Sequence, residues 1–412
     1  MSETTFASEV ASDASVVVRQ PIFDRNRCVW GYELLSRGED EFTSTNLRDL
    51  VSAHMETLPF VGAGLIKDKK LFLNVDKDDF MNANCLPGGL DNCVFGVCDC
   101  GCSTSQYCCF ADSLHEQGGC FAVDCGMNAE AIEKADIVKI SLAGKTPGEI
   151  MRLRKRFKAL DCSLLATDIT DWETFEGTRA LGFQYFQGSF FSLPEVKRDA
   201  GMASVSSAKL QLLRELNNPA CEVDQLAKII STDVILSYRV LRYINSAAFG
   251  LKNHIKSIQQ AVSLLGLGEL KNWASVVVMS TLDTSPKGEE LAYMALQRAC
   301  FLSSLTDSLK RCRHGANTMF MLGLFSKLDA LLSYPMDKAL ADIPLDDEIK
   351  AGLCGTLNEY RDWLQMLEAV EAGDWGLANE ILSNYDACFT QVATDYMKAA
   401  TWAAKQLPEM KN

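Results

Sequence analysis

Residues 121–140 read FAVDCGMNAEAIEKADIVKI, and they show the pattern that recurs through the first half of the chain. It contains two short apolar runs, FAVD at residues 121–124 and IVKI at residues 137–140, separated by a segment that can form a helix. Short apolar strands that alternate with helices are typical of a parallel sheet buried on both faces. The stretch therefore predicts one β–α–β unit.

Similar apolar runs recur on both sides of this unit. They lie at residues 16–18, 28–32, 71–75, 93–97, 163–166 and 183–186. Eight strands separated by helices predict a shortened (β/α)8 barrel of the TIM type over residues 16–196. The carboxyl ends of the strands form the mouth of such a barrel. Asn74, Asp124 and Lys139 stand at or near strand ends and are candidate site residues.

The rest of the chain differs in composition. We expect residues 1–15 to form a flexible tail and residues 197–207, which contain Ser, Ala and Gly, to form a linker. Over residues 208–405 apolar side chains recur at helical intervals, and SIQQ at residues 257–260 has the capping-box pattern of a helix start. The sequence thus predicts an α/β barrel followed by an all-α domain.

Charge and hydropathy exclude several classes of protein. A net charge of −14 argues against a general nucleic-acid binder, and we expect the basic strip RLRKRFK at residues 152–158 to be a solvated helix face. No apolar run reaches the roughly 18 residues that a membrane span needs. The N-terminus lacks the pattern of a signal peptide. We therefore expect a cytoplasmic protein that binds neither nucleic acid nor membrane.

Nine of the 16 cysteines fall between Cys85 and Cys125. Thiolates are preferred ligands of zinc and of iron–sulfur clusters, but the paired C-x2-C spacing of many zinc sites is missing. We expect free thiols in a reducing cytoplasm. A metal held by this segment stays an open alternative.

Two motifs of the first half resemble those of the EAL domain family, the hydrolases of cyclic di-GMP. The first motif is RQPIFD at residues 19–24 followed by WGYELLSR at residues 30–37, and the second is FQYFQGSFFSLP at residues 183–194. The resemblance implies that Glu33, Asn74 and Asp124 correspond to metal ligands. It also relates Lys139 to the lysine near the catalytic water, and the C-terminal glutamine of the family to Gln187.

The remaining acidic ligands of the family are replaced here. Its strand glutamate corresponds to Gly96, the second residue of its aspartate pair to Cys125, and the two glutamates of its A-E-G-V-E motif to Thr167 and Thr170. Phosphodiester hydrolysis normally needs divalent metals held by oxygen ligands, and a soft thiolate is a poor ligand for Mg²⁺. The resemblance therefore implies a degenerate barrel without catalysis, metal or other cofactor, in which Glu33 is vestigial.

Two alternatives stay open at the barrel. One is a cyclic di-GMP phosphodiesterase with an altered metal site, although Asp99 and Asp168, the substitutes at hand, are out of register, which reverses the facing of a strand residue. The other is a sensor that binds cyclic di-GMP without hydrolysis through Gln20, Arg37 and Gln187, which correspond to nucleotide-contacting positions. We expect neither activity, and we do not expect cyclic di-GMP to bind.

The second half resembles the HDOD domain, on the motifs NSAAFG at residues 245–250 and LLGL at residues 264–267. HDOD domains are related to the HD phosphohydrolases, whose metal site requires an adjacent His-Asp pair. None of the four histidines precedes an aspartate, and the corresponding segment reads LFSKLD at residues 324–329. Residues 266–271 could form the turn of a helix-turn-helix, but the apolar residues 273–279 favour a buried helix pair.

Together, these observations imply a regulatory protein without catalytic activity, related to cyclic di-GMP signalling. We expect it to act through contacts with other signalling proteins, whose identity the sequence does not give. Self-association into a homodimer through the barrel helices stays open.

Overall fold

The computed structural model describes residues 16–37, 69–75, 92–97, 103–195, 204–232, 257–308, 314–385 and 389–411, with a few single positions besides. They form two compact units. Unit 1 consists of Met1–Phe191, Ala369–Gly376 and Phe389–Met397, and unit 2 of Ser192–Glu368, Leu377–Cys388 and Lys398–Asn412. The last two segments of unit 1 come from the region that the sequence assigned to the helical domain.

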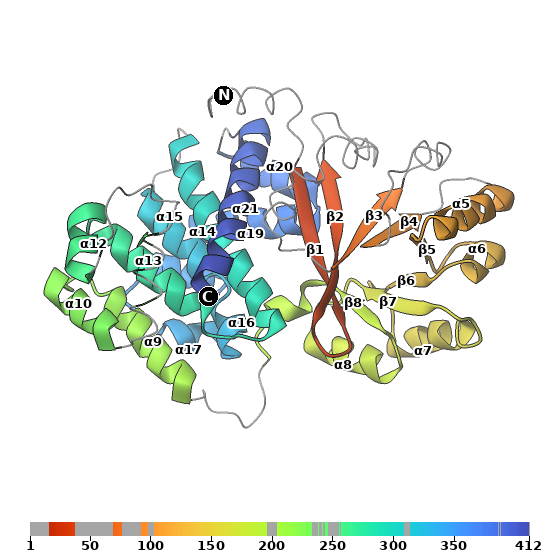
Figure 1. Ribbon diagram of the computed structural model, residues 1–412, viewed down its shortest axis with the longest axis horizontal. Helices are drawn as coiled ribbons and strands as arrows, with labels where there is room; N and C mark the ends of the chain where they lie inside the picture. The colour runs from red at the N-terminus through yellow and green to blue at the C-terminus, as the bar shows by residue number, and fades with distance from the viewer. Residues whose placement is uncertain are drawn as a thin grey trace. The chain divides into compact units, whose positions relative to one another are not determined.

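Eight strands close into a barrel in which their order follows the sequence (Figure 1). They are β1 (Val16–Asp24), β2 (Val29–Arg37), β3 (Lys70–Val75), β4 (Cys93–Val97), β5 (Cys120–Asp124), β6 (Ile137–Ser141), β7 (Ser163–Thr167) and β8 (Tyr185–Gln187). The predicted barrel is therefore confirmed, and each of these strands overlaps a predicted one.

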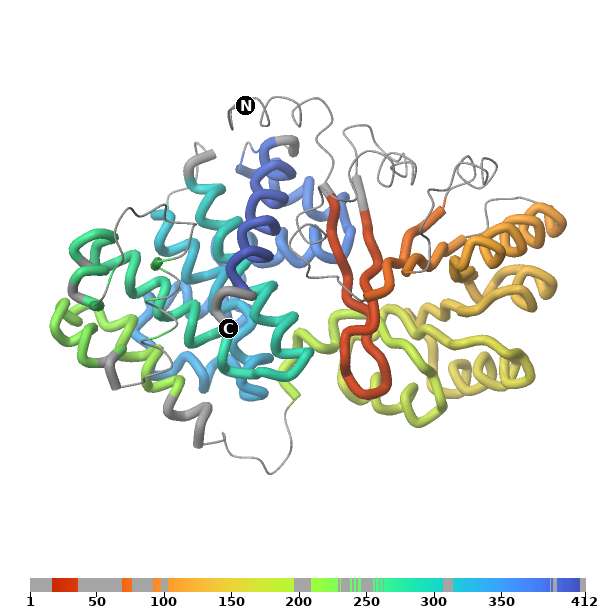
Figure 2. Tube along the Cα trace, in the orientation of Figure 1, coloured from red at the N-terminus to blue at the C-terminus, as the bar shows by residue number. Residues whose placement is uncertain are grey.

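The first strand departs from the parallel arrangement. β1 runs antiparallel to both of its neighbours, β2 and β8, whereas the other neighbouring strands are parallel. Residues 25–28 alone connect β1 to β2, and so short a connection makes a hairpin, which joins antiparallel strands. Figure 2 shows this hairpin in red and orange.

Four helices of unit 1 connect the later strands and lie outside the barrel (Figures 1 and 2). They are α5 (Thr104–Glu116), α6 (Ala129–Glu133), α7 (Pro147–Arg156) and α8 (Trp172–Ala180), and a 3-10 helix, η5 (Ser189–Ser192), follows β8. α7 begins with a capping box, because the Thr146 hydroxyl accepts from the Glu149 amide and the Glu149 carboxylate accepts from the Thr146 amide.

The barrel interior contains a layer of apolar side chains, each at most 2% exposed: Ile22, Phe72, Val94, Ala122, Ile137 and Leu165, with the partly buried Trp30, Cys120 and Tyr185 packed against it. Side chains two positions apart on a strand face the same way. The inner face above this layer is therefore formed by the residues two positions further along β3 to β7: Asn74, Gly96, Asp124, Lys139 and Thr167. The apolar layer thus supports a polar mouth.

The described remainder of the chain is helical, which confirms the predicted all-α region (Figure 1). The helices are α9 (Ser204–Leu216), α10 (Val223–Thr232), α12 (Ile258–Leu265), α13 (Leu267–Ser280), α14 (Pro286–Ser308), α15 (Ala316–Phe325), α16 (Leu328–Leu332), α17 (Met336–Leu340), α18 (Asp347–Leu353), α19 (Glu359–Ala372), α20 (Trp375–Ser383) and α21 (Phe389–Lys411). α9 begins at Ser204, so the end of the predicted linker at residues 197–207 is helical. Within the described residues, none of these helices combines the length and apolarity required to cross a membrane.

Local sequence signals explain several of these helix ends. The serine half of the predicted capping box of α12 is confirmed, since the backbone amide of Gln260 donates to Ser257 Oγ at 3.2 Å. Gly266 separates α12 from α13 with a φ of 85°, a conformation that favours glycine. The apolar run that follows is buried in α13, with Val276 fully buried and Trp273 9% exposed, as expected for a buried helix pair.

Candidate functional site

The carboxylate of Glu33 lies at the centre of the barrel mouth, and its side chain is only 5% exposed. Its Oε1 accepts from Asn74 Nδ2 at 2.9 Å and from Lys139 Nζ at 2.7 Å. Its Oε2 accepts from Gln187 Nε2, which also donates to Gln20 Oε1 at 3.0 Å. The structure therefore brings together five of the residues predicted from the sequence, from five different strands.

Burial alone would raise the pKa of Glu33, because a charged group loses its hydration. The adjacent Lys139 ammonium and the hydrogen bonds from Lys139, Gln187 and Asn74 outweigh that effect and lower the pKa. Glu33 is thus an anion paired with an internal cation. Asp124, which is half-buried beside this pair, has a pKa raised by burial, with Lys139 acting to lower it and Glu33 to raise it.

No room exists for a side chain at Gly96 unless Phe72 moves. A Cβ atom on Gly96 would lie 2.3 Å from Cε1 of Phe72 and 3.1 Å from Oδ1 of Asn74. Phe72 is completely buried in the apolar layer, and Lys139 Nζ lies 5.2 Å from the centre of its ring. The phenyl ring of Phe72 therefore fills the space next to the position where the family resemblance places a glutamate.

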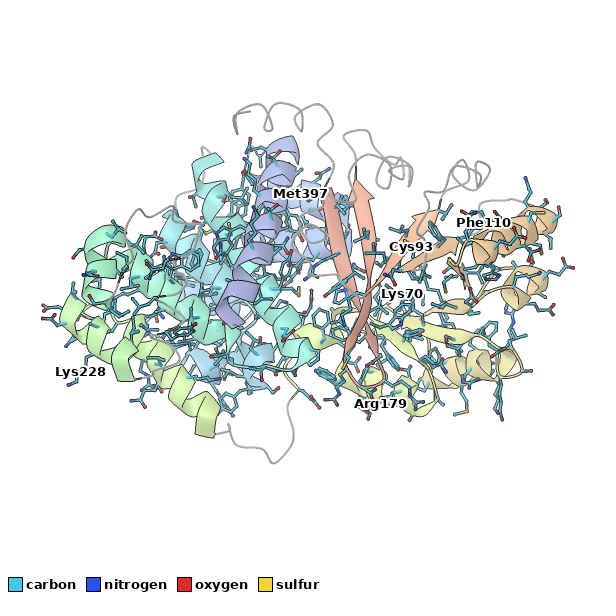
Figure 3. The ribbon with its side chains drawn as sticks, in the orientation of Figure 1. Lys70, Cys93, Phe110, Arg179, Lys228 and Met397 are labelled. Atoms are coloured by element: carbon cyan, nitrogen blue, oxygen red, sulfur yellow. The ribbon has the colours of Figure 1, made fainter. Side chains whose placement is uncertain are left out.

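β3 and β4, which carry Phe72 and Gly96, begin at Lys70 and Cys93, both labelled in Figure 3. The register of the two strands pairs Asn74 with Gly96, so Phe72 lies one inner-face position below that pair. Sequence reasoning missed Phe72. Its alternation with Asn74 along one strand signals an inward-facing side chain, but contact with Gly96 follows only from the strand register.

The other predicted mouth positions carry no clustered acids. Thr167 Oγ1 donates to Asp168 Oδ2 at 3.2 Å, and Thr170 Oγ1 donates to Asp171 Oδ2 at 3.3 Å. Burial raises the pKa of the Cys125 thiol, with lesser effects from nearby charges. These side chains are hydroxyls and a protonated thiol, which are weak ligands for a hard cation.

The strand alternation that we applied to Asp168 does not hold, because β7 ends at Thr167. Asp168 has a φ of 60°, in the left-handed region, and occupies the glycine position of the A-E-G-V-E motif. Its Oδ2 accepts from Ser141 Oγ at 2.5 Å as well as from Thr167. Asp168 is also exposed, so it lies just beyond the end of β7 and does not face into the barrel. Asp99 lies outside the described residues, as does the side chain of Arg37.

The donor set does not fit a divalent metal site. Both oxygens of Glu33 accept from protein donors, and Phe72 occupies the space beside Gly96. In the part of the chain that the structure describes, no group of three or more His, Cys, Asp or Glu residues could hold a metal ion.

The described members of the cysteine-rich segment are free thiols: Cys93, Cys108, Cys109, Cys120 and Cys125. Burial raises the pKa of Cys93. Burial, together with the nearby Asp136 carboxylate, raises the pKa of Cys120 to about 12. Cys85 and residues 98–102 lie outside the described residues, so the alternative of a metal in that part of the segment stays untested.

In unit 2, the segment that corresponds to the His-Asp pair of the HD phosphohydrolases is also buried. Arg298 of α14, 1% exposed, donates from Nη1 to Ser326 Oγ at 3.2 Å. Lys327 is 7% exposed, and burial raises the pKa of Asp329 although Lys327 and Arg298 act to lower it. The polar side chains of residues 324–329 are thus a hydroxyl, one basic group and the Asp329 carboxyl, and Arg298 of α14 adds a second cation beside them.

Residues 202–341 match the HDOD domain family model. Over 94% of its length the chain is 27% identical to YuxH of Bacillus subtilis, covering 97% of that protein. Over an equal share it is 26% identical to CdgJ of Vibrio cholerae, named as a cyclic di-GMP phosphodiesterase, and covers 92% of it. The chain is therefore related over nearly its whole length to a protein of cyclic di-GMP signalling.

Solved structures of EAL proteins are also similar to this chain. YkuI of Bacillus subtilis, described with an EAL domain in complex with cyclic di-GMP and calcium, is 15% identical with a TM-score of 0.36. That match covers 56% of this chain and 76% of YkuI. A standalone EAL protein from Vibrio cholerae, bound to cyclic di-GMP, is 17% identical with a TM-score of 0.31. This second match covers 42% of this chain and 89% of that protein.

Proposed function

We propose that this chain is a regulatory protein of cyclic di-GMP signalling that has no catalytic activity and acts by binding other proteins. The observation that carries the proposal is the set of contacts around Glu33. Its carboxylate accepts from Lys139, Asn74 and Gln187, so both of its oxygens are held by protein donors, and among the described residues no group of three or more His, Cys, Asp or Glu could hold the metal that a metal-dependent hydrolase needs.

Charge at the mouth supports the same proposal. Two divalent cations bound near Glu33, Asp124 and Lys139 would leave about three positive charges uncompensated, which is costly in a partly buried mouth. The positions that could supply further carboxylates carry Gly96, Cys125, Thr167 and Thr170. Phe72 also opposes any side chain at position 96.

Hydrolysis of cyclic di-GMP is the competing function, because CdgJ bears that name at 26% identity. The direct test incubates the purified full chain with cyclic di-GMP and either Mg²⁺ or Mn²⁺, and follows the linear product by chromatography. We expect no product above the rate without protein. The matched control is Glu33→Gln, which keeps the size of the side chain and removes its charge. Turnover in the wild type that Glu33→Gln abolishes would refute the proposal.

Binding without hydrolysis is examined by calorimetry with the same nucleotide. Gln20 and Gln187 bond to one another within the mouth, and Gln187 also donates to Glu33, so these amides are already engaged. We therefore expect no heat of binding and no thermal shift. A measurable affinity that Gln187→Ala weakens would instead assign the protein a sensor function.

The helical unit adds to the proposal. Lys327 cannot coordinate a cation as an aspartate does, and Arg298 places a second positive charge beside Ser326. Since no group of three or more metal-ligating side chains is found in the described part of either unit, contacts made by the surfaces of the chain are the function that we propose.

A further inference from the structure

The outward side of α7 concentrates positive charge on the surface of an acidic chain. Its basic face consists of Arg152, Lys155, Arg156 and Lys158, all exposed, in a protein whose net charge is −14. Among the described residues, no carboxylate forms an ion pair with any of these four side chains. In the described part of the chain, these cations are therefore held in no ion pair, although Arg152 interacts electrostatically with Glu149, one helical turn before it.

Helix capping accounts for only part of this charge. Lys155 and Arg156 lie in the last turn of α7, where cations interact favourably with the helix dipole, and Arg156 Nη1 also donates to the carbonyl of Cys125 at 3.3 Å. Arg152 lies one turn earlier, and Lys158 lies beyond the helix end. These two positions gain little from the dipole, so local stability does not explain the whole face.

An apolar side chain lies within the basic face. Met151 is 47% exposed, is adjacent to Arg152, and lies one helical turn before Lys155. Methionine adapts its shape to different apolar partners and is common at binding surfaces. The face thus offers one apolar contact surrounded by cations.

We propose that the basic face of α7 binds an acidic segment of a partner protein, with an apolar side chain of that segment placed on Met151. The ten residues of α7 span about 15 Å, which matches a partner helix of about three turns. Charge complementarity selects the glutamates or aspartates of the partner. The proposal shares with the proposed function only the premise that the chain binds proteins, and its test involves no turnover.

Nucleic acid fits this face less well. Proteins that bind single strands without sequence preference stack bases on aromatic side chains, and the aromatic residue next to this face, Phe157, is only 2% exposed. The four exposed cations contact fewer phosphates than the roughly six to ten that give strong salt-dependent binding.

The test uses the full chain and a fluorescent synthetic peptide that forms a helix, with glutamates around one leucine in each turn. Fluorescence anisotropy at low salt is expected to show binding that weakens as added salt screens the exposed charges. Replacing Lys155 and Lys158 by Glu should weaken this binding about tenfold. The matched control replaces Lys228 and Lys405, exposed lysines of unit 2, by Glu and should leave it unchanged (Lys228 is labelled in Figure 3).

Two further probes test the chemistry of the occupant. A peptide with serine in place of leucine should bind the wild-type chain with an affinity at least about threefold lower. The variant Met151→Ser should bind the original peptide with a similar loss of affinity. A peptide with lysine in place of glutamate should not bind.

Several results would overturn the proposal. One is that replacing Lys155 and Lys158 weakens peptide binding no more than replacing Lys228 and Lys405 does. Another is that the acidic peptide does not bind the wild-type chain at all. Tighter binding to a single-stranded RNA oligonucleotide than to the peptide would assign the face to nucleic acid. A salt-sensitive dimer in sedimentation, dissociated by the Lys155 and Lys158 replacements, would assign it to a second copy of the chain.

Discussion

Replacing Lys139 by methionine should destabilise the barrel, because the variant leaves the Glu33 carboxylate buried without its cation. The two charged groups lie 2.7 Å apart, and the Glu33 side chain is 5% exposed. Breaking a buried pair from one side typically costs about 3–5 kcal/mol. The Lys139 side chain is 22% exposed, so water can replace part of its contact, and we expect a loss near the lower limit, about 3 kcal/mol.

The same variant should reverse the pH dependence that Glu33 contributes. In the wild type the pKa of Glu33 is lowered below its ordinary value of 4.5, so its contribution to stability is present above that value and is lost as the pH falls through the folded-state pKa. Without Lys139 we expect burial to dominate and the pKa to rise above 4.5. Stability contributed by Glu33 would then be greatest at low pH and fall as the pH rises through the raised pKa.

The assay measures urea unfolding of the full chain at several pH values between about 4 and 8. Hydrogen exchange of peptides from β2 and β6 is the readout, because it reports the stability of the barrel by itself. The control is the double variant Glu33→Gln with Lys139→Met, which removes both charges and should recover at least half of the lost stability. A loss below about 1 kcal/mol at neutral pH, or a pH slope equal to that of the wild type, would refute the argument that Lys139 compensates Glu33.

Three further outcomes follow from the described contacts. Gly96→Ala should lower the free energy of unfolding, measured by denaturant titration, by about 1–3 kcal/mol. The same substitution should cost much less in a Phe72→Ala background, because the ring that the new Cβ atom would meet is then missing. Asp168→Ala should be about 1 kcal/mol less stable than Asp168→Gly, because a φ of 60° favours glycine; equal stabilities would contradict this. Cys120, with a pKa of about 12, should react with iodoacetamide far more slowly than the exposed Cys109, as measured by mass spectrometry of the labelled peptides.

The strands were predictable because each is a short apolar run between polar connections, which is a local property of the sequence. The antiparallel first strand was not predicted, because the apolar runs at residues 16–18 and 28–32 left nine residues between them, whereas β1 extends to Asp24 and leaves only the short connection of a hairpin. The helices of unit 2 followed from their apolar periodicity and from caps such as Ser257. The start of α9 at Ser204 was missed, because serine and alanine occur in linkers and at helix starts alike.

The candidate site was predicted only as a set of residue types. Motif resemblance identified Glu33, Asn74, Lys139 and Gln187, and the barrel brings these four together because each stands at an inward position near the same end of its strand. Which donor reaches which oxygen of Glu33 depends on strand register and side-chain torsions. Neither quantity can be obtained from spacing along the chain.

The largest difference between the two views concerns Gly96. The sequence indicates that one acidic ligand has been replaced by glycine, which by itself describes a gap that a single substitution could fill. The structure shows a phenyl ring, that of Phe72, 2.3 Å from where a Cβ atom would begin, so glycine at 96 and phenylalanine at 72 depend on each other. A carboxylate introduced at position 96 alone would collide with an apolar ring in the barrel core, which tolerates added volume poorly. We therefore expect the four replaced ligands to give a metal site only when Phe72 is changed with them.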